Sequence, residues 1–220
     1  MKNNVLMRNV PKGTFAYGDS PITVELNHDF EIDAFLVTNE RFEKFIESDG
    51  YSNQEFWAEE GWEWKEKFGV IQPDFWEDSK WNCPELPVVG INWFEAQAFA
   101  KWEGKRLPNE KEWEKAARGT DWQMYPWGNE FEENKCNSAE SGIAKTTPVS
   151  KYSNGQSPYG CYDMMGNVWE WTSSFFEEGE TSRVLRGGST FISAIDLGVE
   201  GRSASEPQIR MVDVGFRCAL

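Results

Sequence analysis

The sequence has little histidine and cysteine for its 220 residues. His28 is the only histidine, which excludes mechanisms that need two or three imidazoles, such as a two-histidine iron site. The four cysteines are Cys83, Cys136, Cys161 and Cys218, and no two of them form a Cys-x-x-Cys pair, so we expect no zinc knuckle. Their wide spacing does not indicate a disulfide scaffold, and we expect most of them to be reduced and buried.

Positive charge and long apolar runs are also scarce. The chain has 22 Lys and Arg against 37 Asp and Glu, giving a formal net charge of −15. This charge repels nucleic acid and anionic lipid, so we expect neither as a partner. Most of the carboxylates are expected to form a solvated surface, and a few could hold Ca²⁺. No apolar run is long enough to span a membrane, and residues 1–10 lack the apolar core of a secretory signal, so we expect a cytoplasmic protein.

Aromatic residues, in contrast, are abundant. They make up 15% of the chain, with 12 Trp and 15 Phe, which excludes a disordered protein. No linker, repeat or break in composition divides residues 1–220, so we expect one domain. Apolar and polar residues alternate over 10–39, around Gly13 and Gly18, which predicts short strands joined by turns.

Helical patterns are confined to the first half of the chain. The two main helices are expected at 92–105 and 109–119, because each opens with an asparagine cap and carries an apolar stripe. A shorter amphipathic helix is expected at 40–50. The aromatic stretch 53–69 is interpreted as a helix pair facing the core, with a ligand platform as the alternative. Beyond residue 120 only short strands fit, so the fold class is α+β.

Several motifs occur in a characteristic order. They are PVVGINWFEAQAFAKWEGKRLPNEKEWEKAARG at 87–119, YPWGN at 125–129, TTPV at 146–149, YGCYDMMGNVWEWTSS at 159–174, VLRGGS at 184–189 and GFRCAL at 215–220. Together they resemble the formylglycine-generating enzyme, or sulfatase-modifying factor, family, and the resemblance extends from Val10 to Cys218. It implies a compact variant of the C-type lectin fold with little regular secondary structure.

The resemblance does not fix an activity. The family includes copper-dependent cysteine oxidases, iron enzymes of sulfur-containing betaine synthesis, catalytically silent paralogues and variable ligand-binding proteins of diversity-generating retroelements. The resemblance places the two copper-binding cysteines of the oxidases at Ile192 and Leu197, neither of which can bind Cu(I). His28 alone cannot supply the histidine triad of the iron enzymes. Trp169 and Ser189 match positions that line the family's pocket, although both also have structural roles in silent members.

The cysteines depart from the oxidase pattern as well. In the oxidases, a cysteine matching Cys218 forms a disulfide with one at the position of Ala100, so this bond cannot form here. The loss is consistent with a reducing cytosol. Whether Cys136 and Cys161 pair depends on the fold and is left open.

The stretch Asp163–Glu170 matches a structural calcium loop of the family. By resemblance the ligands are the Asp163 and Glu170 carboxylates and the Gly166 and Val168 carbonyls, which are the hard oxygen ligands that Ca²⁺ prefers. The alternative is a turn that serves only the core. A second family site would use Asn137 and the Ser138 carbonyl, but a shortened acidic loop argues against it.

The interval between Ser189 and Gly215 resembles the variable segment of the retroelement proteins, with Arg202, Pro207 and Arg210 as anchors. The candidate binding residues are the non-anchor positions Phe191, Ile192, Ser193, Ile195, Asp196, Ser203, Ala204, Ser205, Glu206, Gln208, Ile209, Met211, Val212 and Asp213. An exposed apolar patch there would mark a partner site, and burial of these side chains is the alternative. Adenine-directed diversification of Asn-type codons does not readily yield Glu, Gln or Met, which favours an ordinary silent paralogue.

The sequence therefore predicts a non-catalytic binding protein of this family, without the catalytic cysteine pair. It would present the region 190–213 to a protein partner and hold at most a structural Ca²⁺, with no copper or iron. The alternative is a divergent oxidoreductase of the sulfatase-modifying-factor type that acts on protein or small-molecule thiols.

Overall fold

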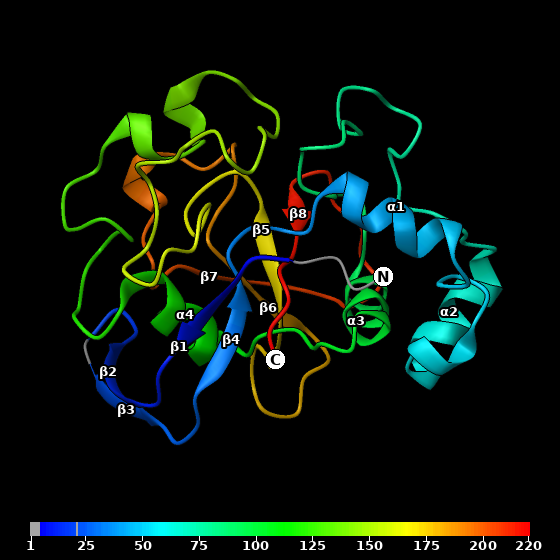
Figure 1. Cartoon of the computed structure of the whole chain (residues 1–220), viewed down its shortest axis with the longest axis horizontal. Helices are drawn as coiled ribbons and strands as arrows, with labels where there is room; N and C mark the ends of the chain where they lie inside the picture. The colour runs from blue at the N-terminus through cyan, green and yellow to red at the C-terminus, as the bar shows by residue number, and fades with distance from the viewer. Residues whose placement is uncertain (1–4, 21) are drawn as a thin grey trace.

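The computed structural model in Figure 1 describes residues 5–20 and 22–220. Residues 1–4 belong to the stretch inspected for a signal, Pro21 belongs to the expected strands of 10–39, and all five lie outside the described residues. The described part contains four α-helices, which are α1 (Asn39–Glu47), α2 (Glu59–Phe68), α3 (Trp93–Trp102) and α4 (Glu110–Arg118). No helix of this part is both long enough and apolar enough to cross a membrane.

The strands form three small sheets. Two antiparallel pairs join β1 (Met7–Val10) to β4 (Phe30–Asp33) and β2 (Gly13–Tyr17) to β3 (Ile22–Leu26). The third sheet has the order β7-β6-β5-β8, made of β7 (Arg202–Ser205), β6 (Arg183–Arg186), β5 (Trp169–Phe175) and β8 (Val214–Gly215). The mixture of helices and small sheets confirms the expected α+β class and leaves long stretches of irregular chain between elements.

The helices agree with the sequence in position but differ in number. Asn92 and Asn109 each form a complete capping box, which explains why α3 and α4 were the clearest predictions. The two main helices are present as expected, and α1 and α2, inside the other two expected helical stretches, are of nearly the same length. The expected helix pair in 53–69 is one short 3₁₀ turn (Gln54–Phe56) followed by α2, because the backbone at Trp57 is extended.

Two large hydrophobic clusters form the core. The first packs α1 and α3 against β5 and β8, with the Phe42 and Phe99 rings stacked at a centroid distance of 5.2 Å. Phe56, Trp57 and Trp62 of the aromatic stretch join this cluster as predicted, whereas Phe68 near its end is exposed. The second cluster packs the two N-terminal strand pairs against α4 and reaches Leu197 and Val199. The two clusters hold the ends of the region 190–213 in place.

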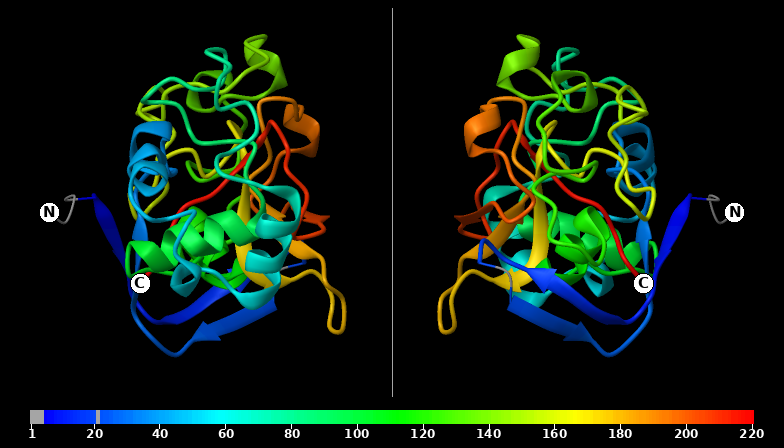
Figure 2. Two further views of the ribbon diagram at one scale, coloured as in Figure 1. Left: turned by 90° about the vertical axis from the view of Figure 1, so that its right-hand side faces the viewer. Right: turned by 90° about the vertical axis from the view of Figure 1, so that its left-hand side faces the viewer.

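The C-terminal segment closes the molecule. Ala219 forms bridges with both Ile32 on β4 and Arg106 before α4. In Figure 1 this red segment passes between β4 and α3. In Figure 2 the region 190–213, coloured orange to red, runs along the side opposite the N-terminus. The predicted binding residues therefore share one side of the molecule.

Candidate binding surface and calcium loop

The region 190–213 begins at a tight glycine turn after β6. Gly187 and Gly188 have φ angles of 92° and 73°, which L side chains rarely adopt. A Cβ atom on Gly188 would lie 2.3 Å from Leu197 Cδ2 and 3.8 Å from Ile192 Cβ. Leu197 is buried in the second cluster and Ile192 packs against it. The two predicted cysteine-equivalent positions therefore both lie beside this turn, and both carry apolar side chains that pack in the second cluster.

The thiols of the chain lie elsewhere. All four cysteines are free, so Cys136 and Cys161 do not pair, and Cys83 alone is exposed. Burial raises the thiol pKa of Cys136 to about 12 and of Cys161 to about 11, and it raises the pKa of Cys218 as well. The buried thiols thus stay protonated at neutral pH and are poor nucleophiles.

The two predicted pocket residues, Trp169 and Ser189, meet at Asp213. The Ser189 hydroxyl donates to Asp213 Oδ2 at 2.8 Å, and the Trp169 backbone N–H donates to the Asp213 carbonyl at 2.9 Å. Ser189 is fully buried and its oxygen also accepts from the Phe191 N–H at 3.3 Å. Through these contacts the Ser189 hydroxyl fixes the start of the region 190–213.

The binding residues divide by exposure. The exposed ones are Phe191, Ile195, Asp196, Ala204, Glu206, Gln208 and Ile209. The half-buried ones are Ile192, Ser193, Ser203, Ser205, Met211, Val212 and Asp213. Ile195 stands out, because 90% of its surface is accessible. Met211 packs on the first cluster and Val212 on a third, smaller one. The two interpretations of the apolar positions, an exposed patch and burial, therefore each hold for some of them.

The region 190–213 is not one continuous exposed loop. It contains a 3₁₀ turn at Ala194–Asp196, the buried residues Leu197–Val199, and β7 at the edge of the third sheet. Leu197 and Val199 are buried because they complete the second hydrophobic cluster. Glu140 accepts from the Ala194 N–H at 2.7 Å, a contact between distant loops that nothing in the sequence indicates.

The three predicted anchors each bind the framework. Arg202 Nε donates to Glu110 Oε2 at 2.8 Å. The Pro207 carbonyl accepts from the Trp93 N–H at 3.0 Å, at the start of α3. Arg210 Nε donates to the buried Glu95 at 2.8 Å. The chain between these points is therefore held in a fixed path.

The calcium loop has a sharp bend, with a positive φ at Asp163, Gly166 and Asn167. Glu170 does not offer a free carboxylate, because its two oxygens accept from Arg217 Nε and Nη2 at 2.7 and 2.8 Å. Asp163 Oδ2 is buried and has no hydrogen-bond partner among the described residues. Burial raises the pKa of Asp163 to about 8. Glu170 is thus paired with a guanidinium, whereas Asp163 has a buried carboxylate oxygen without a hydrogen bond among the described residues, and calcium binding by this loop stays a prediction.

The second proposed calcium site is also engaged in protein contacts. Asn137 Oδ1 accepts from the hydroxyls of Ser141 and Thr190 at 3.0 and 3.2 Å. The Ser138 carbonyl accepts from the Ser141 hydroxyl at 2.8 Å. Within residues 5–20 and 22–220, no three His, Cys, Asp or Glu side chains gather as a metal site.

The one histidine, His28, contacts the start of α4. Its Nε2 lies 2.9 Å from Glu112 Oε1, next to the α4 cap.

We expect the thermal unfolding midpoint to be the same in EDTA and in excess Ca²⁺, because Arg217 neutralises Glu170. A ligand that binds only the folded state would raise the midpoint. Differential scanning calorimetry in the two buffers makes the measurement, with Asp163→Ala as the companion variant. A rise with Ca²⁺ that Asp163→Ala abolishes would instead support the calcium loop predicted from sequence.

The small sheets, the capped helices and the glycine turn define a mixed α/β protein of the C-type-lectin-like class. Residues 2–220 match the family described as "Sulfatase-modifying factor enzyme 1-like domain". The chain belongs to this family, that of the formylglycine-generating enzymes.

Relatives within the family carry different names. The chain is 34% identical to "Inactive C-alpha-formylglycine-generating enzyme 2" of Mus musculus, over 92% of this chain and 78% of that one. It is 33% identical to "Hercynine oxygenase" of Mycobacterium tuberculosis (strain ATCC 25618 / H37Rv), over 86% of this chain and 52% of that one. The solved structure titled "Treponema denticola variable protein 1" aligns with a TM-score of 0.72 at 23% identity, over 97% and 94% of the two chains. That structural likeness shows the fold alone.

Proposed function

We propose that this chain is a non-catalytic member of the family that binds a protein partner through the region 190–213. The observation that carries the proposal is the exposure of Phe191, Ile195 and Ile209 on a segment whose path is fixed by framework contacts. Apolar side chains held exposed on one side of a protein are typical of binding sites. Because the backbone is already ordered, little conformational entropy would be lost on binding.

The lack of catalysis is supported by the packing at the glycine turn. Ile192 and Leu197 converge at Gly188, where the family's oxidases are expected to hold Cu(I) between two thiolates. The protonated buried thiols offer no substitute ligand pair. The similarity to a relative named as inactive agrees with this proposal. We therefore expect no oxygen consumption with cysteine or peptidyl-cysteine substrates, with or without added Cu(I).

The binding proposal predicts that Phe191→Asp with Ile195→Asp reduces partner capture by about tenfold or more, the effect typical of losing interface hot spots. The measurement is affinity capture from host extract with quantitative mass spectrometry. Ile22→Asp is the matched control, because Ile22 is an exposed isoleucine on β3.

A supporting result is a protein that wild type and Ile22→Asp retain equally and that the double variant loses. The proposal is wrong if every captured protein is retained equally by the double variant. Oxygen consumption with a thiol substrate would favour the oxidoreductase alternative instead.

A further inference from the structure

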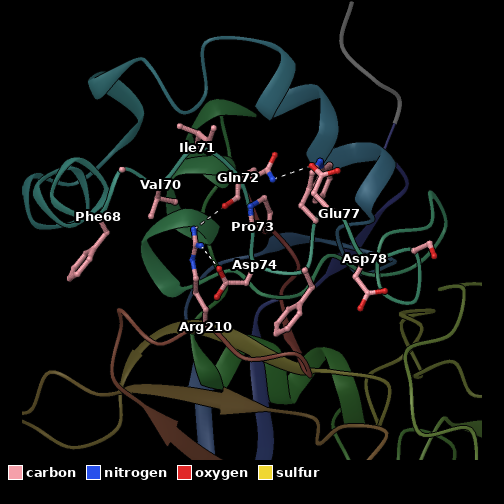
Figure 3. A pocket seen from close by; sticks show the side chains of 13 residues that line it. Phe68, Val70, Ile71, Gln72, Pro73, Asp74, Glu77, Asp78 and Arg210 are labelled. Carbon is pink, nitrogen blue, oxygen red and sulfur yellow. Dashed lines mark hydrogen bonds and ion pairs between the residues drawn. The ribbon is translucent and has the colours of Figure 1, made fainter.

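A second surface lies along the segment that follows α2. An open groove of about 800 Å³ follows the segment 69–79 from the end of α2 past Arg210 (Figure 3). Three large apolar side chains line it and stay accessible: Phe68 at 62%, Ile71 at 69% and Phe75 at 43%. Exposed apolar side chains along an open groove are typical of an interaction site.

The walls of the groove are fixed by hydrogen bonds. The Asp74 N–H donates to the Gly90 carbonyl at 2.8 Å, and the Gly90 N–H donates to the Met211 carbonyl at 2.9 Å. Arg210 Nη2 donates to the Gln72 carbonyl at 3.2 Å, as Figure 3 shows. A ligand would therefore meet a preformed groove rather than a loop that must first become ordered.

Phe75 adopts a backbone conformation that bulky residues avoid. Its φ is 62°, in the left-handed region, yet its ring remains partly exposed. Full burial of the ring would compensate for this conformation, but the ring lines the groove instead. Unfavourable backbone conformations of this kind cluster at binding and catalytic sites.

The rim of the groove is acidic. The carboxylates of Asp74, Glu77 and Asp78 line it, and Arg210 is the cation among the lining residues. Arg210 Nη1 donates to Asp74 at 2.8 Å and its Nη2 donates to the buried Glu95 at 2.5 Å. Because Glu95 and Asp74 neutralise the guanidinium, Glu77 and Asp78 leave the rim with a net negative charge.

We propose that this groove binds a basic amphipathic peptide segment of a partner protein. Its apolar side chains would lie against Phe68, Ile71 and Phe75, and its Lys or Arg side chains would face Glu77 and Asp78. The acidic rim repels anionic lipid and nucleic acid, which leaves a cationic peptide as the complementary partner. This proposal goes beyond the proposed function, because every lining residue except Arg210 lies outside the region 190–213.

The test uses a fluorescein-labelled 12-residue peptide of leucine and lysine, followed by fluorescence anisotropy at low ionic strength. We expect saturable binding that Glu77→Lys weakens about tenfold, because the substitution replaces attraction by repulsion at contact distance. Ile71→Ser should weaken binding about fivefold through lost apolar contact. A serine–lysine peptide and a leucine–glutamate peptide should each bind at least tenfold more weakly to wild type.

Matched controls separate this site from general attraction to a chain of charge −15. Glu178→Lys makes the same charge change in the exposed β5–β6 loop, and Ile22→Ser removes an exposed isoleucine from β3. Both controls should bind the leucine–lysine peptide like wild type. The proposal is overturned if the peptide does not bind saturably, or if Glu178→Lys weakens binding as much as Glu77→Lys. Phe191→Asp with Ile195→Asp should leave this binding unchanged, which separates it from the function proposed for the region 190–213.

Discussion

Glu170→Ala is expected to destabilise the fold by about 3–5 kcal/mol, the loss typical of leaving a buried charge without its partner. Arg217 and Glu170 are both fully buried and joined by two hydrogen bonds of 2.7 and 2.8 Å. Arg217 also donates to the Asp33, Ala34 and Tyr162 carbonyls, so it cannot turn toward solvent without breaking these contacts. Urea unfolding in EDTA and in Ca²⁺ should give the same loss.

A double variant without either charge of the pair tests the cause of this loss. Glu170→Leu with Arg217→Met removes both charges, and we expect it to be more stable than Glu170→Ala, since neither group of the pair is left buried without its partner. Glu31→Ala, at an exposed position on β4, is the control and should change stability by less than about 0.5 kcal/mol. A loss for Glu170→Ala that appears only in Ca²⁺ would assign the carboxylate to a metal instead of to Arg217.

Ile192→Cys with Leu197→Cys is expected to create a Cu(I) site. Both side chains lie beside Gly188, and a pair of neighbouring thiolates is a soft ligand set suited to Cu(I). The measurement is anaerobic competition with bicinchoninate. Both the parent and the variant should carry Cys83→Ser, because Cys83 is the one exposed thiol among the described residues.

The control for this experiment is Ile192→Ser with Leu197→Ser, which opens the same space without thiols. We expect the double cysteine variant to hold one equivalent of Cu(I) at least about a hundredfold more tightly than this control. Equal binding by the two variants would show that the loop geometry has diverged from that of the oxidases. Tight binding by the parent would reveal a soft-metal site and revive the enzyme alternative.

Local sequence signals predicted the parts of the fold that depend on neighbouring residues. Asn92 and Asn109 mark helix starts because a cap and its partner lie three residues apart. The pairing of Glu170 with Arg217 spans 47 positions, so the motif around Glu170 could not reveal it. The motif indicated a calcium ligand, and it could not indicate that a guanidinium contacts the same carboxylate.

Of the two candidate surfaces, one was predicted from the sequence and the other was not. The anchors Arg202 and Arg210 were predicted from the resemblance, and both bind glutamates of the framework. The groove along 69–79 was missed, because the left-handed backbone of Phe75 leaves no mark in the sequence. An aromatic pair, Phe75 and Trp76, among polar residues was the one available signal.

The closure by Ala219 has a consequence for how the chain reaches its folded state. Ile32 pairs with Ala219, and the Asp33 carboxylate accepts from the Cys218 N–H across a separation of 185 positions. Contacts between such distant positions slow folding, because a long loop must close first. β4 should therefore gain its full set of partners only late in folding.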